Sequence, residues 1–299
     1  MKTLNNILIY IFIVSFYLIS CESDNVTINN DPVFSIKFSD STVVNEKDIV
    51  FYDSSTCILF LKNKLTLTIG PEDPPYSFIE FSVLVDDEII YQGIIYPDML
   101  FVAPCPIELY ISADTYPNFN NDIIQLKYDK NILNDPRIIK SLEKSNLLHH
   151  GITCIIDSVK VFSYNDSSVM CSITLRNYDD INYYILDPER MGVSSFNCYT
   201  TGLVLSNLTT HNSHTPIHSN SLSDCNILVL DDLSILMGKS EITYTYKSSY
   251  YPRIDKGIYK GHLRFSSMID RPVTLSLDQE NGRVWVGKIF STLDSIIFE

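Results

Sequence analysis

The sequence is poor in residues that build helices and phosphate-binding loops. Its 299 residues include only two alanines, Ala103 and Ala113, ten glycines and a single tryptophan, Trp285. Alanine is the strongest helix former, whereas the abundant Ile, Val, Tyr and Thr favour strands. The composition therefore favours an all-β fold and disfavours glycine-rich loops that cradle phosphates.

Clusters of positive charge are also missing. Lys and Arg number 22 against 36 Asp and Glu, which gives a formal net charge of -14. Nucleic-acid binding needs Lys and Arg to neutralise phosphates, so we expect no nucleic-acid partner. The chain has no G-x-S-x-G, H-E-x-x-H, P-loop or C-x-x-C pattern. We therefore predict no cofactor and no catalytic residue.

The amino terminus has the layout of a secretory signal peptide. Lys2 supplies a positive start, and the apolar run 7–19 is shorter than the ~20 residues of a spanning helix. The small residue Ser20 precedes Cys21. We predict a signal peptide over 1–20, removed before Cys21, and a flexible tether over 21–31.

The residues around Cys21 indicate a lipid anchor. Leu18-Ile19-Ser20-Cys21 resembles the lipobox of bacterial lipoproteins, and Glu22-Ser23-Asp24 is similar to the acidic tract of surface lipoproteins in Bacteroidetes. The resemblance implies lipid attachment, such as palmitate, at Cys21, and a cell-envelope protein at the outer membrane, exposed on the surface or facing the periplasm. Stable anchoring needs more than one acyl chain, at ~0.8 kcal/mol per buried CH2. The alternative is an ordinary cleaved signal peptide.

The mature chain is predicted to form two β-rich domains, 32–148 and 149–299. Apolar alternation and turn residues predict strands in the first domain over 34–38, 65–69, 78–85, 88–91, 107–111 and 123–128. Asp135 as N-cap and Pro136 at the first position predict one helix, which continues through 137–148. We expect His149 and His150 to cap its end.

Strands dominate the second predicted domain as well. They are expected over 152–163, 169–176, 202–205, 227–230, 242–246, 258–265, 273–277, 284–290 and 295–298, with a hairpin turn at Asn281-Gly282. The segments SITLRNYDDINYYIL, LMGKSEITYTY and DKGIYKGHLRF resemble immunoglobulin-like envelope domains, which implies a fold but no function. The predicted fold is all-β, with two β-sandwich-like domains, the C-terminal one immunoglobulin-like, and one short helix at their junction.

Six cysteines follow Cys21, and the sequence leaves their state open. Outside the cytoplasm they could form up to three disulfides, or several could be buried thiols. They are Cys57, Cys105, Cys154, Cys171, Cys198 and Cys225. A hairpin turn at Asn165-Asp166 places Cys154 and Cys171 too far apart for a direct cross-strand bridge.

Three sets of residues are candidates for chemistry or binding. His211, His214 and His218 share one polar loop, and could hold a metal or simply be solvated. Tyr250 and Tyr251 precede a proline and could stack on a sugar or anchor a protein partner. The acidic pairs fall where turns are expected, at Asp86-Asp87, Asp179-Asp180 and Asp231-Asp232.

The sequence thus predicts a lipid-anchored envelope protein that displays β-sandwich domains for binding or assembly. Its expected partners are the membrane, through the N-terminal lipid, and an envelope protein or a glycan. Two alternatives remain. One is a carbohydrate-active or glycan-binding surface protein, whose carboxylates would converge only in the fold. The other is a metal-binding envelope domain that uses the three histidines.

Overall fold

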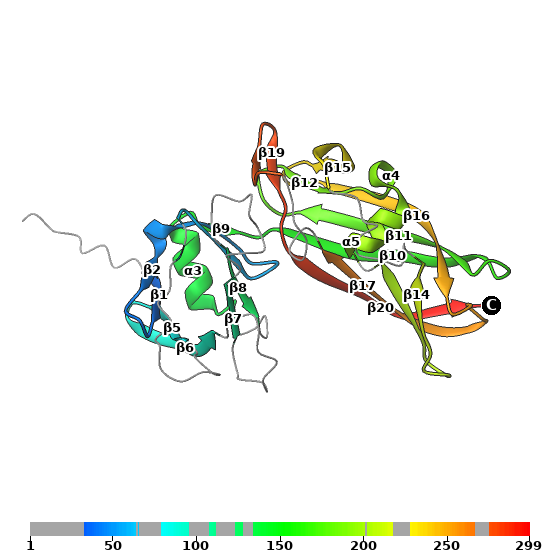
Figure 1. Cartoon of the computed structure of the whole chain (residues 1–299), viewed down its shortest axis with the longest axis horizontal. Coiled ribbons are helices and arrows are strands. Elements are labelled where there is room, and N and C mark those ends of the chain that lie inside the picture. The colour runs from blue at the N-terminus through cyan, green and yellow to red at the C-terminus, as the bar shows by residue number, and fades with distance from the viewer. Residues whose placement is uncertain are drawn as a thin grey trace, which may run out of the picture. The chain divides into compact units, whose positions relative to one another are not determined.

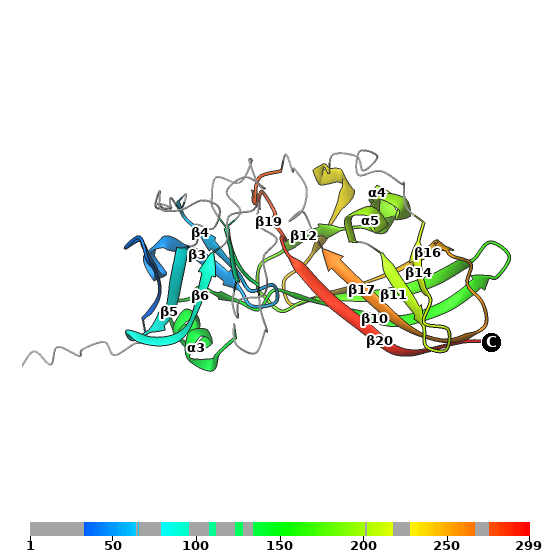
Figure 2. The ribbon, with the colours of Figure 1, turned by 60° about the horizontal axis from the view of Figure 1, so that its bottom comes forward.

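The computed structural model describes residues 33–63, 65, 79–95, 108–111, 123–127, 134–200, 202–217, 228–266 and 275–299. Residues Val33–Glu299 form one compact unit, and most of its elements are strands (Figures 1 and 2). The predicted signal peptide, Cys21 and the tether lie outside the described residues. Within the described ranges, no helix has both the length and the apolar character to cross a membrane.

The first part of the unit is a nine-stranded sheet in the order β2-β1-β5-β6-β7-β8-β4-β3-β9. Its strands are β1 (Phe34–Phe38), β2 (Val43–Asn45), β3 (Ile49–Asp53), β4 (Ile58–Leu61), β5 (Ile79–Val85), β6 (Glu88–Ile95), β7 (Glu108–Ile111), β8 (Ile123–Lys127) and β9 (Leu148–His149). The predicted hairpin at Asp86-Asp87 is confirmed, and both residues have positive φ, as tight hairpin turns require. The strand expected over 65–69 lies almost wholly outside the described residues.

The predicted helix is confirmed as α3 (Pro136–Lys144), although it ends at Lys144 and not at the predicted 148, which lies in β9. The Asp135 carboxylate accepts the Arg137 N–H, and Pro136 occupies the first turn, where its missing N–H costs nothing. Ile138 and Leu142 are buried in the core of the first sheet. The expectation that His149 and His150 cap this helix is wrong. Ser145 caps it, and His149 lies in β9, which runs parallel to β3.

The second part contains a seven-stranded sheet in the order β10-β11-β16-β14-β13-β17-β20 and a four-stranded sheet in the order β15-β12-β19-β18. The strands are β10 (Ile152–Ser163), β11 (Ser168–Asn177), β12 (Tyr183–Leu186), β13 (Leu203–Asn207), β14 (Ser213–Pro216), β15 (Leu233–Leu236), β16 (Glu241–Tyr251), β17 (Gly257–Ser266), β18 (Asp278–Gln279), β19 (Gly282–Val284) and β20 (Lys288–Phe298). Together with the first sheet they confirm an all-β fold with sandwich-like sheets.

The seven-stranded sheet curls until its two edge strands lie side by side. The Ile156 N–H on β10 donates to Ser291 Oγ on β20 at 3.2 Å, and the Tyr164 hydroxyl donates to the Glu299 carbonyl at 2.8 Å. Both bonds join residues 135 positions apart, so the two strands run in the same direction. Figure 2 shows β10, β17 and β20 next to one another. The curled sheet encloses a core that includes Trp285.

Two short helices, α4 (Pro188–Met191) and α5 (Val193–Thr200), depart from the prediction of a single helix. Phe196 of α5 is fully buried and packs against Tyr246 and Phe265 of the curled sheet. These helices therefore form part of the second core.

Three predicted strands of the second part also differ from the structure. The segment 228–232 is a loop followed by a short 3-10 turn, and the neighbouring strand is β15 instead. The strand predicted over 284–290 is interrupted by residues 285–287 between β19 and β20. A hairpin is confirmed here as β18–β19, but its turn consists of Glu280 and Asn281 and not of the predicted Asn281-Gly282, because Gly282 already pairs with Gln279. Of the strand predicted over 273–277, residues 275–277 are not strand, and the rest lies outside the described residues.

Each part has a hydrophobic core of its own, and a third cluster joins them. Phe51, Ile58 and Phe60 come from the first sheet, whereas Leu277 and Val286 come from the second part. The two cores and the cluster that joins them lie within one compact unit, 33–299.

Candidate functional site

The histidines proposed as metal ligands do not form a site within the described residues. His214 is buried, its Nδ1 lies 2.9 Å from the Pro252 carbonyl, and its ring packs edge-on against Tyr259. His211 is exposed in the turn after β13, and His218 lies outside the described residues. No group of three or more His, Cys, Asp or Glu suited to a metal occurs in the described part of the chain.

The two candidate tyrosines at the end of β16 have opposite environments. Tyr250 is buried in the second core, where burial raises the pKa of its hydroxyl well above its usual range. Tyr251 is 74% exposed. Of this pair, only Tyr251 offers its ring to a partner in this conformation.

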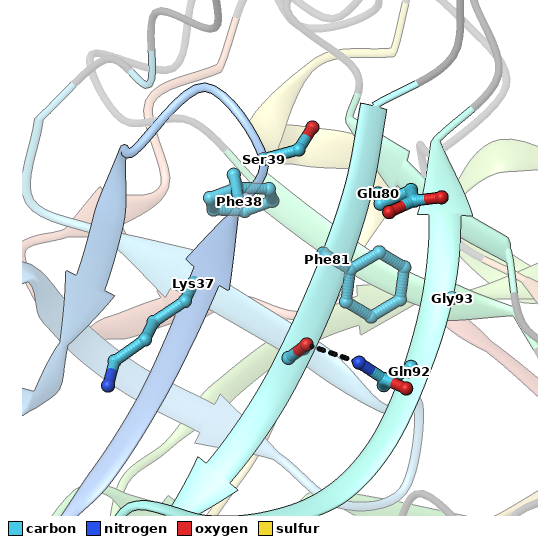
Figure 3. Close-up of a pocket in the computed structure, with 8 residues that line it drawn as sticks. Lys37, Phe38, Ser39, Glu80, Phe81, Gln92 and Gly93 are labelled. Atoms are coloured by element: carbon cyan, nitrogen blue, oxygen red, sulfur yellow. Dashed lines mark hydrogen bonds between the residues drawn. The ribbon is translucent and has the colours of Figure 1, made fainter.

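A shallow hollow lies on the first sheet over β1, β5 and β6 (Figure 3). Its volume is about 430 Å3, and the Gln92 amide donates to Ser82 Oγ at 3.0 Å within it. Phe38 and Phe81 also line it, but their rings are almost fully buried. Lys37 turns away to pair with Asp87 at 3.0 Å. The hollow therefore presents a few polar groups and no exposed aromatic platform for a sugar.

Buried polar side chains are concentrated where the chain passes from the first part to the second. Residues far apart in the sequence meet there and bury polar groups together. We call this region the junction cluster, and it consists of Asp53, Ser55, Thr56, His149, His150, Gly151, Asp179 and Tyr183. The sequence predicted a turn at Asp179 and a helix cap at His149, but not that they would meet.

Asp179 is the main acceptor of the junction cluster. Its Oδ1 accepts the His150 N–H at 2.7 Å, and its Oδ2 accepts the Gly151 N–H at 2.9 Å and the Tyr183 hydroxyl at 2.7 Å. His149 Nδ1 lies 3.6 Å from the same oxygen. Burial alone would raise the pKa of Asp179, but these hydrogen bonds outweigh it and lower the pKa below its ordinary value. Asp179 is thus an ionised anchor for two main-chain N–H groups.

Asp53 lies at the end of β3, next to Gly151. Its Oδ1 accepts the Ser55 N–H at 2.8 Å, the Ser55 hydroxyl at 2.6 Å and the Thr56 N–H at 3.3 Å. Complete burial raises the pKa of Asp53 to about 6, because desolvation outweighs these hydrogen bonds, and the charge of Asp179 adds to the shift. The two carboxyl groups of the junction cluster therefore have pKa values displaced in opposite directions.

Solvent reaches one side of the junction cluster through a cavity of about 350 Å3. It is lined by Glu143, Asn146, Leu148, His149, His150, Asp179, Asp180, Ile181 and Lys239. The Lys239 ammonium donates to the Tyr178 carbonyl at 2.6 Å and lies 3.7 Å from Asp180. Because both oxygens of Asp179 already accept hydrogen bonds, two of them from main-chain N–H groups, this carboxylate holds the main chain in place.

The cysteines are in mixed states. Cys198 on α5 is disulfide-bonded, whereas Cys154 and Cys171 are buried thiols without a disulfide. In the β10–β11 register Cys171 pairs with Val159 and Cys154 with Leu175, which confirms that the two cysteines do not face each other. Burial raises the pKa of Cys171 to about 12, so this thiol stays protonated and inert.

Comparison with known protein families, with curated proteins and with solved structures finds no match for this chain.

Proposed function

We propose that this chain is a lipid-anchored cell-envelope protein whose β-rich body binds another envelope protein and catalyses no reaction. The observation that carries the binding role is a group of exposed apolar side chains near the C-terminus. We call it the C-terminal apolar patch, and it consists of Phe162, Leu208, Ile258 and Ile297, each between 45% and 65% exposed. Contiguous apolar surface of this kind is typical of protein–protein contact sites.

The four side chains of the C-terminal apolar patch lie at or beside strand ends. Phe162 is near the end of β10 and Ile297 near the end of β20, whereas Leu208 follows β13 and Ile258 is near the start of β17. Ile258 on β17 and Ile297 on β20 are cross-strand partners. The Leu208 N–H donates to the Ile258 carbonyl at 2.8 Å, which brings Leu208 alongside. Phe162 and Ile297 line one hollow of about 540 Å3 at the ends of β10 and β20.

The chemistry of the patch favours a protein partner over a glycan. Three of its four side chains are aliphatic, and the Lys247 ammonium lies 3.9 Å from the centroid of the Phe162 ring. A sugar needs an open aromatic face and several polar partners, whereas a protein surface can bury aliphatic side chains directly.

The envelope location rests on the sequence around Cys21 and is supported by the disulfide at Cys198, because disulfides persist in oxidising compartments outside the cytoplasm. The chain from Cys21 to Val33 could reach at most about 40 Å when fully extended. A lipid at Cys21 would therefore keep the folded body, and its partner, close to the membrane surface.

Metabolic labelling with a palmitate analogue tests the anchor. We expect the full chain, produced in a Gram-negative host, to incorporate the label and to fractionate with membranes. Cys21→Ala should lose both properties, whereas Cys171→Ala, which removes a core thiol, should keep them. Equal labelling of Cys21→Ala and the unsubstituted chain would refute the anchor.

Co-purification from detergent-solubilised envelopes tests the binding surface. Ile297→Asp places a charge in the C-terminal apolar patch and should remove the partner, at a cost of at least tenfold in recovered complex. Thr245→Asp, at an exposed strand position outside the patch, is the matched control and should bind normally. Equal recovery with both variants would rule out the patch as the contact surface.

A further inference from the structure

Two buried carboxyl groups flank the residue at which the chain passes between the two parts. A Cβ placed on Gly151 would lie 2.4 Å from Asp53 Oδ1, so Asp53 is in contact with this residue. The Gly151 N–H donates to Asp179 Oδ2 at 2.9 Å. Because Gly151 has a φ of +70° and no side chain, both carboxyl groups can approach its main chain closely.

The two carboxyl groups are not equivalent. Both oxygens of Asp179 accept main-chain hydrogen bonds, so this group is held in its ionised form. The hydrogen bonds that Asp53 accepts all fall on Oδ1. Asp53 can therefore take up a proton on Oδ2 without losing any of them.

We propose that Asp53 and Asp179 form a pH-sensitive fastener between the two parts of the protein. When Asp53 is protonated, the turn 53–56 rests against Gly151. When Asp53 ionises, two negative charges face each other across one residue in a buried site, and their repulsion loosens the contact.

The direction of the pH effect follows from the two shifted groups. Burial raises the pKa of Asp53 from 3.8 to about 6, so the folded state binds this proton more tightly than the unfolded state. The resulting stability is complete at low pH and is lost as the pH rises through about 6. Asp179 has a lowered pKa, so its contribution is lost only as the pH falls through that value in acid. The contact between the turn 53–56 and Gly151 is therefore most stable at pH values between the lowered pKa of Asp179 and the raised pKa of Asp53.

Other ionisable groups surround the pair and must be separated from it. They are Tyr52 and Cys57 from the first sheet, His149 on β9, Tyr183 on β12 and Arg283 on β19. Burial raises the pKa of both tyrosines, so they stay neutral below pH 8. Histidine is the remaining side chain whose charge ordinarily changes between pH 5 and 8, so His149 is the rival explanation.

Amide hydrogen exchange on the full chain tests the fastener. We expect protection of the Thr56 and Gly151 N–H groups, corrected for the intrinsic rate, to fall about tenfold between pH 5 and 8, since the pKa of Asp53 lies about one unit above pH 5 and each unit is a factor of ten. The Ile173 N–H in the second core serves as the reference and should not change. Asp53→Asn should remove the pH dependence, because Asn keeps an acceptor at Oδ1 and cannot ionise.

Two matched variants complete the experiment. Asp180→Asn removes an exposed charge beside Asp179, and His149→Gln removes the imidazole that lies 3.6 Å from Asp179 Oδ2. Both variants should retain the pH dependence. The proposal is overturned if the pH dependence of protection survives in Asp53→Asn, or if it disappears in His149→Gln. If Asp53→Asn does not fold, the proposal is tested on the unsubstituted protein by following the 13C chemical shift of the Asp53 carboxyl as a function of pH. A midpoint near pH 6 supports the fastener, and one at or below the ordinary value of about 4 overturns it.

Discussion

The junction cluster buries polar side chains, whereas the C-terminal apolar patch exposes apolar ones. At the junction cluster, carboxyl groups such as Asp179 are buried and bonded to main-chain N–H groups. At the C-terminal apolar patch, side chains such as Ile297 and Phe162 are more than half exposed. Burying a carboxylate is unfavourable unless it is satisfied, and exposing isoleucine forgoes hydrophobic stabilisation.

The difference indicates which region serves the fold and which serves a partner. The donors on Asp179 come from His150, Gly151 and Tyr183 of the same chain, so this carboxylate is satisfied without a ligand. The C-terminal apolar patch, in contrast, would gain stability from being covered. We therefore expect substitutions at the junction cluster to act on stability, and substitutions at the patch to act on binding.

The largest effect is expected for Gly151→Ala. A Cβ there would lie 2.3 Å from Ser55 Oγ and 2.4 Å from Asp53 Oδ1, and the φ of +70° disfavours alanine as well. Together, backbone strain and overpacking should lower the free energy of unfolding by about 3 to 4 kcal/mol in urea denaturation. Gly192→Ala is the control, because its φ is also positive (+80°) but nothing lies within 4 Å, so it should cost less by the overpacking contribution of about 1 to 3 kcal/mol. Equal losses would show that the junction cluster tolerates the extra methyl group.

The next largest effect is expected for Asp179→Asn. The amide keeps one acceptor oxygen, but its NH2 group would face donors, so buried N–H or hydroxyl groups lose their partner. Loss of charge-assisted hydrogen bonds should cost about 2 to 3 kcal/mol, measured as a lower urea midpoint. The neighbouring Asp180→Asn should be nearly neutral, since the Asp180 side chain is 89% exposed. A neutral Asp179→Asn would mean that the carboxylate does not fasten the chain.

Local signals in the sequence predicted the elements that depend on local chemistry. Asp135-Pro136 marked the start of α3, and Asp86-Asp87 marked a hairpin. The same Asp-Pro signal occurs at Asp187-Pro188, where Asp187 accepts the Glu189 N–H at the start of α4, and it could have revealed that helix. α5 gave no such signal, because its Ser, Thr and Val residues are weak helix formers and Phe196 is held by packing.

The junction cluster could not be predicted, because its residues are far apart in the sequence and the local context of each one indicates only a local structure. Asp179 has the sequence context of a turn, and it does lie in the loop between β11 and β12. Its donors come from the link between β9 and β10 and from β12, and Asp53 comes from β3, more than a hundred residues away. The break in the strand predicted over 284–290 has the same origin. Gly287 packs against Thr56, and Val286 joins Phe51 in the cluster between the two parts.

A smaller difference in stability is expected between variants of two cation–π contacts, one beside the junction cluster and one at the C-terminal apolar patch. The Arg283 guanidinium lies 4.1 Å from the centroid of the buried Phe51 ring beside the junction cluster, and the Lys247 ammonium lies 3.9 Å from the exposed Phe162 ring. Desolvated pairs of this kind contribute about 1 to 2 kcal/mol and exposed ones less than about 1 kcal/mol. We expect Arg283→Met to be more destabilising than Lys247→Met in thermal denaturation. The reverse order would argue that the contact beside the junction cluster is the weaker one.

The smallest effect on stability is expected within the C-terminal apolar patch. Ile297→Ser should change the free energy of unfolding by no more than about 0.5 kcal/mol, because its side chain is already in water. Ile296, its neighbour on β20, is 4% exposed and packs in the second core, so Ile296→Ser should cost about 3 kcal/mol. Urea denaturation of the two variants measures the contrast directly. A large loss for Ile297→Ser would place this side chain in the core of the protein, and the patch would then have no surface to offer a partner.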